Sequence, residues 1–180
     1  MIIEGSRKIL DKKYKNIKKT IFEFVGVILT VILINKFIIF TAYIPSESMV
    51  PTLNVGDRVA VTRVYNPSNL KRGDVIIFKS DELNEILVKR LIGLPGDEIE
   101  FKGTNIYVNG KKLNEDYINN TVSFEGRYKV PDDRYFFLGD NRSNSFDSRY
   151  WKEPFIKGKD IIGKVQFRIW PLKNIGSIKK

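Results

Sequence analysis

The sequence predicts a mostly β protein, with one antiparallel β-sheet domain preceded by a single amino-terminal transmembrane helix. Two observations carry this prediction. A basic tail leads directly into a hydrophobic stretch, and the rest of the chain consists of short runs of β-branched and aromatic residues separated by glycine, proline and asparagine. With 180 residues, the chain has room for one such domain plus an anchor. We expect a basic tail over residues 1–20, a membrane span over 21–43 and a β-rich domain over 44–180.

The basic tail carries half of the excess positive charge. The net charge of the chain is +10, and residues 1–20 contribute seven basic side chains against Glu4 and Asp11, which leaves +5. Charge concentrated in front of a hydrophobic stretch is typical of a topogenic signal rather than of a nucleic-acid surface. Because basic residues stay on the cytoplasmic side of a span, we expect the amino terminus in the cytoplasm and the chain after Ile44 on the outer face of the cell membrane.

The hydrophobic stretch can cross a bilayer only with its flanking residues. Its uncharged part, residues 24–35, reaches roughly 18 Å as a helix, whereas residues 21–44 reach roughly 36 Å, against a hydrocarbon core of about 30 Å. The longer span places Glu23 and Lys36 near its two faces, where a lysine side chain can extend to the headgroups. A buried core helix and a removable signal peptide are the alternatives. No small-x-small cleavage site follows the stretch, so we expect an uncleaved anchor in the lipid bilayer.

Beyond the anchor, the pattern predicts β-strands. Asn109-Gly110, between two short runs, is a strong signal for a two-residue hairpin. The last run alternates apolar with polar residues from Lys164 to Ile169, as in a strand with one buried face. The expected strands cover residues 58–64, 75–79, 86–92, 98–101, 105–108, 135–138 and 162–170.

The chain contains no histidine and no cysteine. Their absence excludes disulfides, a catalytic cysteine, an imidazole base and the ordinary zinc ligand sets. The polar stretch of residues 139–149 lacks the spacing of a calcium loop, since Arg142 stands at the third ligand position. No phosphate-binding glycine loop occurs in the sequence. We therefore expect no metal, no cofactor, no nucleotide and no nucleic-acid partner.

Ser48 and Lys89 are the candidate reactive pair. Ser46 and Ser48 lie in a segment bounded by prolines, which continues neither a helix nor a strand. Without imidazole or thiolate, a serine nucleophile needs an amine or a carboxylate as its base. Lys89 lies between Leu87 and Leu91 on one face of an expected strand, and burial there would have to lower its pKa by roughly 3 units for it to act near pH 7. A turn serine and a solvent-exposed strand lysine are the alternative interpretations.

Four blocks of sequence, residues 45–53, 72–79, 89–97 and 139–149, resemble in their order those of bacterial type I signal peptidases. These are membrane-anchored serine proteases that cut signal peptides from exported preproteins after small-x-small sites. The resemblance implies that Ser48 is the nucleophile that forms an acyl-enzyme and Lys89 the general base. It also implies an oxyanion hole made by the Ser46 hydroxyl and the Ser48 N–H. The other implied roles are orientation of the lysine amine by Ser145, an ion pair of Asp147 with Arg149, loop support by Asp140 and Asn141, and small apolar pockets lined by Ile44, Met49, Leu53 and Val88.

The resemblance favours the compact Gram-positive form, because only the short stretch of residues 98–129 separates Asp97 from Val130. Lysine rather than histidine after Val88 argues against the eukaryotic-type branch. Two other functions remain open. One is a self-cleaving Ser-Lys peptidase of the repressor type, which would need a DNA-binding domain where this chain has its anchor. The other is a membrane-tethered, non-catalytic β module that binds exported peptides.

Overall fold

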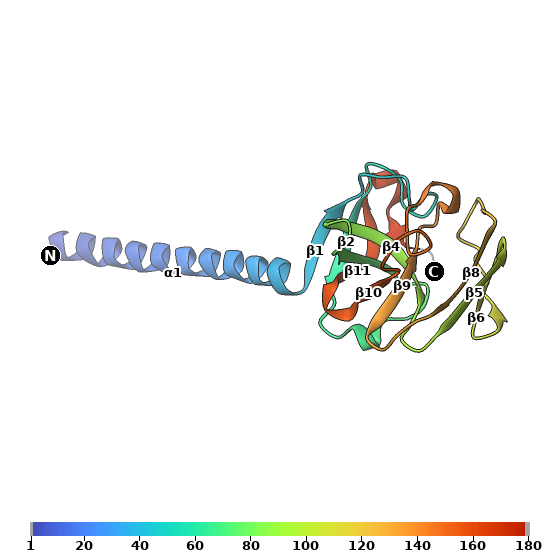
Figure 1. Ribbon diagram of the computed structural model, residues 1–180. Helices are drawn as coiled ribbons and strands as arrows, with labels where there is room; N and C mark the ends of the chain where they lie inside the picture. Colours follow the sequence, from blue (N-terminus) through green and yellow to red (C-terminus); the bar gives the residue numbers. More distant parts are fainter. Residues whose placement is uncertain (1, 179–180) are drawn as a thin grey trace. The chain divides into compact units, whose positions relative to one another are not determined.

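The computed structural model describes residues 2–178, and the side chains from residue 16 onward. The chain divides into two compact units, residues 1–39 and residues 40–180. The helix α1 (Ile2–Phe37) makes up nearly all of the first unit (Figure 1). Its described side chains are exposed, including large apolar ones such as Phe22, Phe24 and Ile28.

The first unit bears on the predicted anchor in two ways. A helix with the length and apolar character needed to cross a bilayer is absent from the described part of the chain. The membrane span over residues 21–43 therefore stays a prediction. Its last five residues form the strand β1 (Ile39–Tyr43) instead of continuing the helix. Phe40 and Ala42 of this strand pack against a core cluster of the second unit, which favours an extended chain there.

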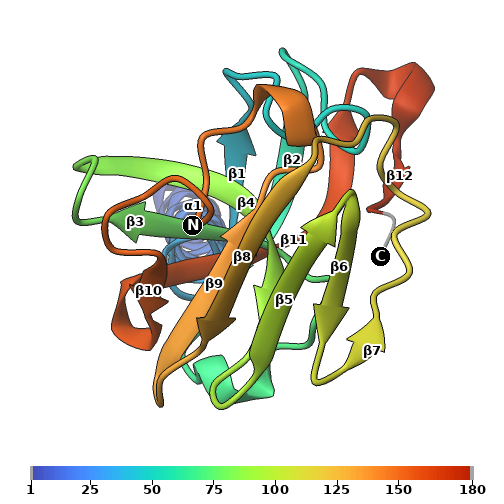
Figure 2. The same ribbon diagram turned by 45° about the vertical axis from the view of Figure 1, so that its right-hand side comes forward.

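Two antiparallel sheets form the second unit (Figure 2). The larger has the strand order β1-β2-β11-β3-β4-β9-β10, with β12 paired to β11, and the smaller has the order β7-β6-β5-β8. The mostly β, antiparallel fold is therefore confirmed. The strands of the larger sheet after β1 are β2 (Arg58–Arg63), β3 (Val75–Ser80), β4 (Glu85–Gly93), β9 (Arg134–Leu138), β10 (Phe155–Lys157), β11 (Ile161–Trp170) and β12 (Gly176–Ser177). The smaller sheet contains β5 (Glu98–Gly103), β6 (Asn105–Val108), β7 (Lys111–Lys112) and β8 (Phe124–Lys129).

The predicted strands are β2, β3, β4, β5, β6, β9 and β11, with ends that differ from the prediction by two residues at most. The hairpin between β6 and β7 is also confirmed. Asn109 and Gly110 have φ values of +52° and +76°, and a two-residue turn of this kind requires positive φ at both positions. The pattern did not indicate β1, β8, β10 or β12.

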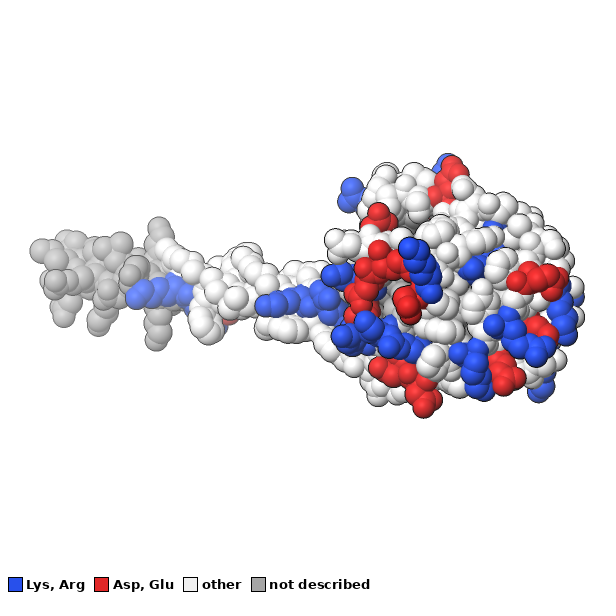
Figure 3. Space-filling model, in the orientation of Figure 1, with Lys and Arg blue, Asp and Glu red and all other residues white. Residues whose placement is uncertain are grey.

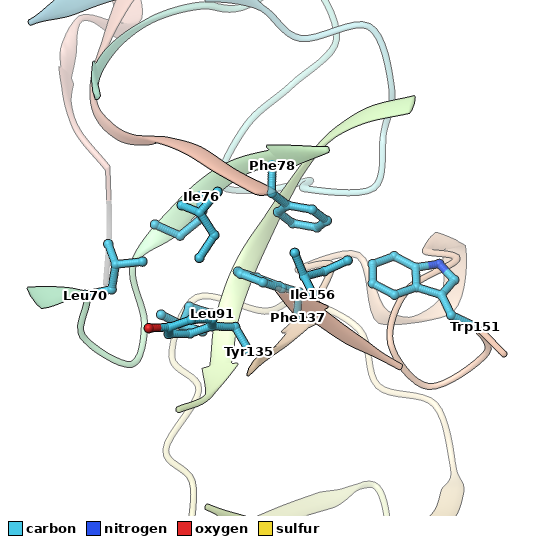
Figure 4. Close-up of a cluster of buried hydrophobic side chains, with 9 residues drawn as sticks. Leu70, Ile76, Phe78, Leu91, Tyr135, Phe137, Trp151 and Ile156 are labelled. Atoms are coloured by element: carbon cyan, nitrogen blue, oxygen red, sulfur yellow. The ribbon is translucent and has the colours of Figure 1, made fainter. Parts of the chain in front are cut away.

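Strand β9 is buried on both faces, which explains its unbroken apolar sequence. Tyr135 and Phe137 lie in one core cluster, where Phe78 stacks on Phe137 with 4.3 Å between ring centroids (Figure 4). Phe136 and Leu138 lie in a second cluster, shared with the smaller sheet. A third cluster joins the segment between β1 and β2 to the larger sheet and contains Ile44, Met49, Leu53, Val59, Val61, Val75, Ile77 and Val165. The segment between β1 and β2 is therefore anchored in a packed core.

Charged side chains are mixed on the face of the second unit drawn in Figure 3. Lys157 lies 2.9 Å from Asp81 and Lys129 lies 3.3 Å from Glu98, and all four side chains are well exposed. Solvent screens such pairs, so they add little to stability.

Candidate active site

Ser48 lies in the segment of residues 44–53, here called the serine segment, which is the first part of the connection between β1 and β2. Ser48 itself is half-buried, and its Oγ lies 3.4 Å from the Oγ of Ser46. The segment is fixed by three side chains that are at most 2% exposed, Ile44, Met49 and Leu53. Apolar anchors on both sides of Ser48 therefore hold the hydroxyl at the surface of the core.

Ser48 and Lys89 line the same pocket. Residues of β1 and of the first half of β4 bound this pocket, and most of its lining is apolar. Of the residues predicted to form substrate pockets, Ile44, Met49 and Val88 line it. Leu53 has a different place, because it is fully buried in the core cluster and is not part of the lining. The pocket thus brings both predicted reactive groups to one apolar surface.

Lys89 is 4% exposed, although it is a lysine. Burial lowers its pKa from 10.5 to about 8, since a charged amine loses its hydration there. Asp147 and Asp140 act against this by favouring the charged amine, whereas Arg149 adds to it by repulsion. With a pKa near 8, about a tenth of the lysine is neutral at pH 7. A solvent-exposed strand lysine is therefore excluded for this position.

Ser145 lies beside the serine segment, and Gly139 makes this approach possible. A Cβ atom on Gly139 would stand 2.2 Å from the Ser145 Oγ and 2.5 Å from the Ser48 carbonyl oxygen. Only glycine fits such close neighbours without displacing them. The Ser145 Oγ is buried and has no hydrogen-bond partner among the described residues. Its hydroxyl is thus free to bond a group that enters the site.

Two buried ion pairs lie behind these groups. Asp147 binds Arg149 through two contacts, 2.8 Å to Nε and 2.9 Å to Nη2, and also accepts the Gly139 N–H at 3.0 Å. Asp140 binds Arg90 at 2.8 Å and 2.6 Å, and both side chains are fully buried. Paired carboxylates of this kind rigidify a loop, and removing one partner leaves a costly buried charge.

A family model described as signal peptidase, peptidase S26, matches residues 17–170 of this chain. The chain belongs to this family. A probable signal peptidase I-2 from Synechocystis is 41% identical over 79% of this chain and 68% of that protein. Signal peptidase I P from Bacillus subtilis subsp. natto is 39% identical over 93% of this chain and 98% of that protein. Signal peptidase IB from Staphylococcus aureus is 40% identical over 77% of this chain and 82% of that protein.

Among solved structures, a crystal structure of a signal peptidase I from Enterococcus faecalis V583 is similar. It shares 33% identity, and the match covers 53% of this chain and 96% of that chain with a TM-score of 0.46.

The sequence did not reveal several groups that support the site of this S26 peptidase. Arg90 joins three segments, since it binds Asp140, the Thr52 hydroxyl at 3.2 Å and the Gly73 carbonyl at 2.7 Å. Arg142 and Asn120 take part in a further network described below. Arg90 directly follows Lys89, and Arg142 lies in the polar stretch, so the sequence indicated where they are but not what they bind. For Asn120 the sequence carried no signal.

Proposed function

We propose that this member of peptidase family S26 removes signal peptides from exported preproteins, with Ser48 as nucleophile and Lys89 as general base. One observation carries the assignment of roles: the Ser48 hydroxyl and a buried lysine with a pKa of about 8 line one apolar pocket. The family membership supports the reaction, since the relatives named above are signal peptidases.

The proposed chemistry uses one amine twice in each half-reaction. Neutral Lys89 takes the proton of Ser48 as the Oγ adds to the carbonyl carbon of the scissile peptide. The Ser46 hydroxyl and the Ser48 N–H donate hydrogen bonds to the oxyanion that forms. The Lys89 ammonium then protonates the leaving amine, the C–N bond breaks, and an acyl-enzyme remains. In the second half, Lys89 takes a proton from water, hydroxide adds to the ester carbon, and the Ser48 oxygen leaves with the proton returned.

The free part of β4 supports binding of an extended substrate. Residues 85–90 of β4 pair with β3, whereas β4 pairs with β9 only from Arg90 to Gly93. Within the described residues, the first half of β4 therefore has main-chain groups on one side available to a further strand. A peptide strand added there would place alternate side chains in the apolar pocket beside Ser48 and Lys89. The mostly apolar lining suits apolar side chains at the substrate positions that face it.

The proposal includes a membrane anchor in the helical part of the predicted span, residues 21–37, because residues 39–43 form β1 of the larger sheet. The amino terminus would lie in the cytoplasm and residues 40–180 on the outer face. The basic tail and the exposed apolar side chains of α1 support it. Phe22, for example, is 79% exposed. Exported preproteins carry their own apolar signal segment, so enzyme and substrate would meet at one bilayer.

The test is cleavage of a preprotein whose signal ends in Ala-x-Ala by the detergent-solubilised full chain. Wild type should cut after the second alanine, whereas Ser48→Ala and Lys89→Ala should each reduce kcat at least roughly a thousandfold. Two exposed residues provide matched controls: Ser123→Ala and Lys79→Ala should keep wild-type activity. Equal cleavage by Lys89→Ala would contradict the assigned base. If wild type bound the preprotein without cutting it, the non-catalytic module would be the better description.

A further inference from the structure

The connection between β7 and β8, residues 113–123, is here called the strap. It belongs to the smaller sheet, yet its side chains contact the polar stretch of residues 139–149 next to Ser48. Resting on the proposed function, we propose that the strap residue Asn120 is a positioning residue, which orients the oxyanion-binding N–H of Ser48 through Asn141.

The first step is the contact of Asn141 with the serine segment. The Asn141 backbone N–H donates to the Ser48 carbonyl at 3.0 Å, and its Nδ2 donates to the Glu47 carbonyl at 3.1 Å. The Glu47 C=O and the Ser48 N–H belong to one planar trans peptide unit, in which they point in opposite directions. The Val50 N–H donates to the same Glu47 oxygen at 3.0 Å, so the two donors together fix the direction of the Ser48 N–H. These hydrogen bonds also polarise that peptide unit and strengthen its N–H as a donor.

The second step is the orientation of the Asn141 amide. Its Oδ1 accepts a hydrogen bond from the Asn120 Nδ2 at 2.7 Å. The Asn120 Oδ1 in turn accepts the Ser143 N–H at 3.3 Å, so Asn120 also has a defined orientation. An amide can donate only from nitrogen and accept only at oxygen. The Ser143 hydroxyl donates to the same Asn141 oxygen at a longer distance of 3.4 Å. While these two donors, of which Asn120 is the closer, occupy the Asn141 oxygen, the Asn141 nitrogen faces Glu47. Asn141 is 9% exposed, so little water is available to replace a lost bond.

The third step is the attachment of the strap itself. Glu115 forms a two-contact ion pair with Arg142, with 2.8 Å between Oε2 and Nη1, and both side chains are at most 8% exposed. Tyr117 donates to the Glu115 Oε1 at 2.7 Å, and its ring covers the Arg90 guanidinium at 3.7 Å from the ring centroid. The segment that carries Asn120 is thus held by buried contacts of its own. It offers Asn141 a fixed partner rather than a mobile surface group.

The experiment compares Asn120→Ala with the neighbouring, exposed strap residue as Asn119→Ala, in the detergent-solubilised full chain with an Ala-x-Ala preprotein. Asn120→Ala should lower kcat about tenfold with KM unchanged. A Ser48 N–H that points in the wrong direction stabilises the oxyanion less, but the loss is smaller than when an oxyanion-hole donor is removed. The pH at half-maximal rate should stay at its wild-type value, because Lys89 is not touched. Asn120→Asp should be at least as impaired, because a carboxylate would face the Asn141 oxygen and favour rotation of that amide. Asn119→Ala should behave as wild type.

Two further measurements separate positioning from loss of structure. In a double-mutant cycle, Asn120→Ala added to Asn141→Ala should cause little further loss of kcat, because the proposed effect of Asn120 on the Ser48 N–H runs through Asn141. With ¹⁵N-labelled serine, the Ser48 amide proton, assigned by its loss in Ser48→Ala, should change its NMR chemical shift in Asn120→Ala but not in Asn119→Ala.

An unchanged kcat in Asn120→Ala, additive losses in the cycle, or an unmoved Ser48 amide would each overturn the inference. An inert wild type would instead overturn the proposed function. The amide shift would still decide in that case whether Asn120 orients Ser48.

Discussion

At the scale of single residues, the surroundings of Lys89 shift its pKa in opposite directions. Burial lowers its pKa, while the nearby carboxylate of Asp147 favours the charged amine. Arg149 binds that carboxylate with two hydrogen bonds and repels the Lys89 charge. The ion pair therefore does more than hold the loop together, because Arg149 counteracts the effect of the Asp147 carboxylate, which favours the charged lysine. The sequence indicated this pair but not its effect on the base.

The pH dependence of cleavage should report this pKa. A general base acts when neutral, so kcat/KM should rise with pH, reach half its maximum near pH 8 and level off above it. Below the midpoint the rate should fall about tenfold per pH unit. A pH–rate profile of the full chain on a neutral peptide substrate measures it. A midpoint near the ordinary lysine value of 10.5 would contradict the assignment.

The lowered pKa of Lys89 also makes the folding stability depend on pH. Between about pH 8 and 10.5 the unfolded chain binds a proton that the folded chain lacks at Lys89, so this residue makes stability increase with pH across that window.

At the scale of secondary-structure elements, the polar stretch of residues 139–149 connects β9 with the serine segment through side-chain and main-chain contacts. It follows β9, touches the serine segment at Gly139 and Asn141, and returns to β9 where Ser148 accepts the Phe137 N–H at 3.0 Å. It includes only one short turn of 3₁₀ helix, Arg142–Asn144. Side-chain hydrogen bonds therefore take the place of regular structure in holding it.

Gly139→Ala tests how tightly this polar stretch is packed. The added methyl group would overlap the Ser145 hydroxyl and the Ser48 carbonyl, so one of them must move. We expect loss of cleavage by at least roughly tenfold and destabilisation of about 1–3 kcal/mol. Thermal unfolding together with the cleavage assay measures both effects. Gly176→Ala is the matched control, because a Cβ there meets no atom within 4 Å. Equal cleavage and equal thermal stability of the two variants would show that the polar stretch can make room for the added methyl group.

A strand could be predicted where its own residues show the burial pattern of a strand. β9 and β11 were found because their own residues show the pattern of burial. β8 was missed because Gly126 and three charged residues, at positions 125, 127 and 129, conceal the alternation of Phe124 and Tyr128. β1 was missed because its apolar residues continue the apolar stretch of α1.

In the site, too, residues within local motifs could be predicted, whereas contacts made by the fold could not. Ser48, Lys89, Asp147 and Arg149 stand in recognisable motifs. The bond between Asn120 and Asn141 joins residues 21 positions apart, and only the folded strap brings them together. Leu53 was predicted to line a substrate pocket, whereas it is fully buried in a core cluster that includes residues of β2 and β3, which no motif indicates.

At the scale of the whole molecule, every proposed catalytic group lies in the unit of residues 40–180. The smaller sheet supplies the strap, so it supports the site without lining the pocket that holds Ser48 and Lys89. The helix α1 belongs to the other unit and contributes no described residue to that pocket. Chemistry and anchoring are thus assigned to separate parts of the chain.

Removing residues 1–38 should therefore separate the two properties. The full chain should float with liposomes and resist alkaline extraction, whereas the shortened chain should remain in the soluble fraction at least in part. Both should cut a short soluble peptide with similar kcat/KM. The shortened chain should cut a preprotein embedded in liposomes roughly tenfold more slowly or worse, because it loses the local concentration that a shared bilayer provides. Full-length protein that stays soluble beside liposomes would contradict the anchor.

The unpaired side of β4 has a consequence for how many substrates one enzyme can serve. Apart from proline, all residues carry the same main-chain groups, so residues 85–89 would bind an extended segment through contacts that depend little on its side chains. Discrimination then rests on the few positions that face the pocket. Cargo proteins could thus diverge freely elsewhere, and a cell could add new secreted proteins without altering the enzyme that matures them.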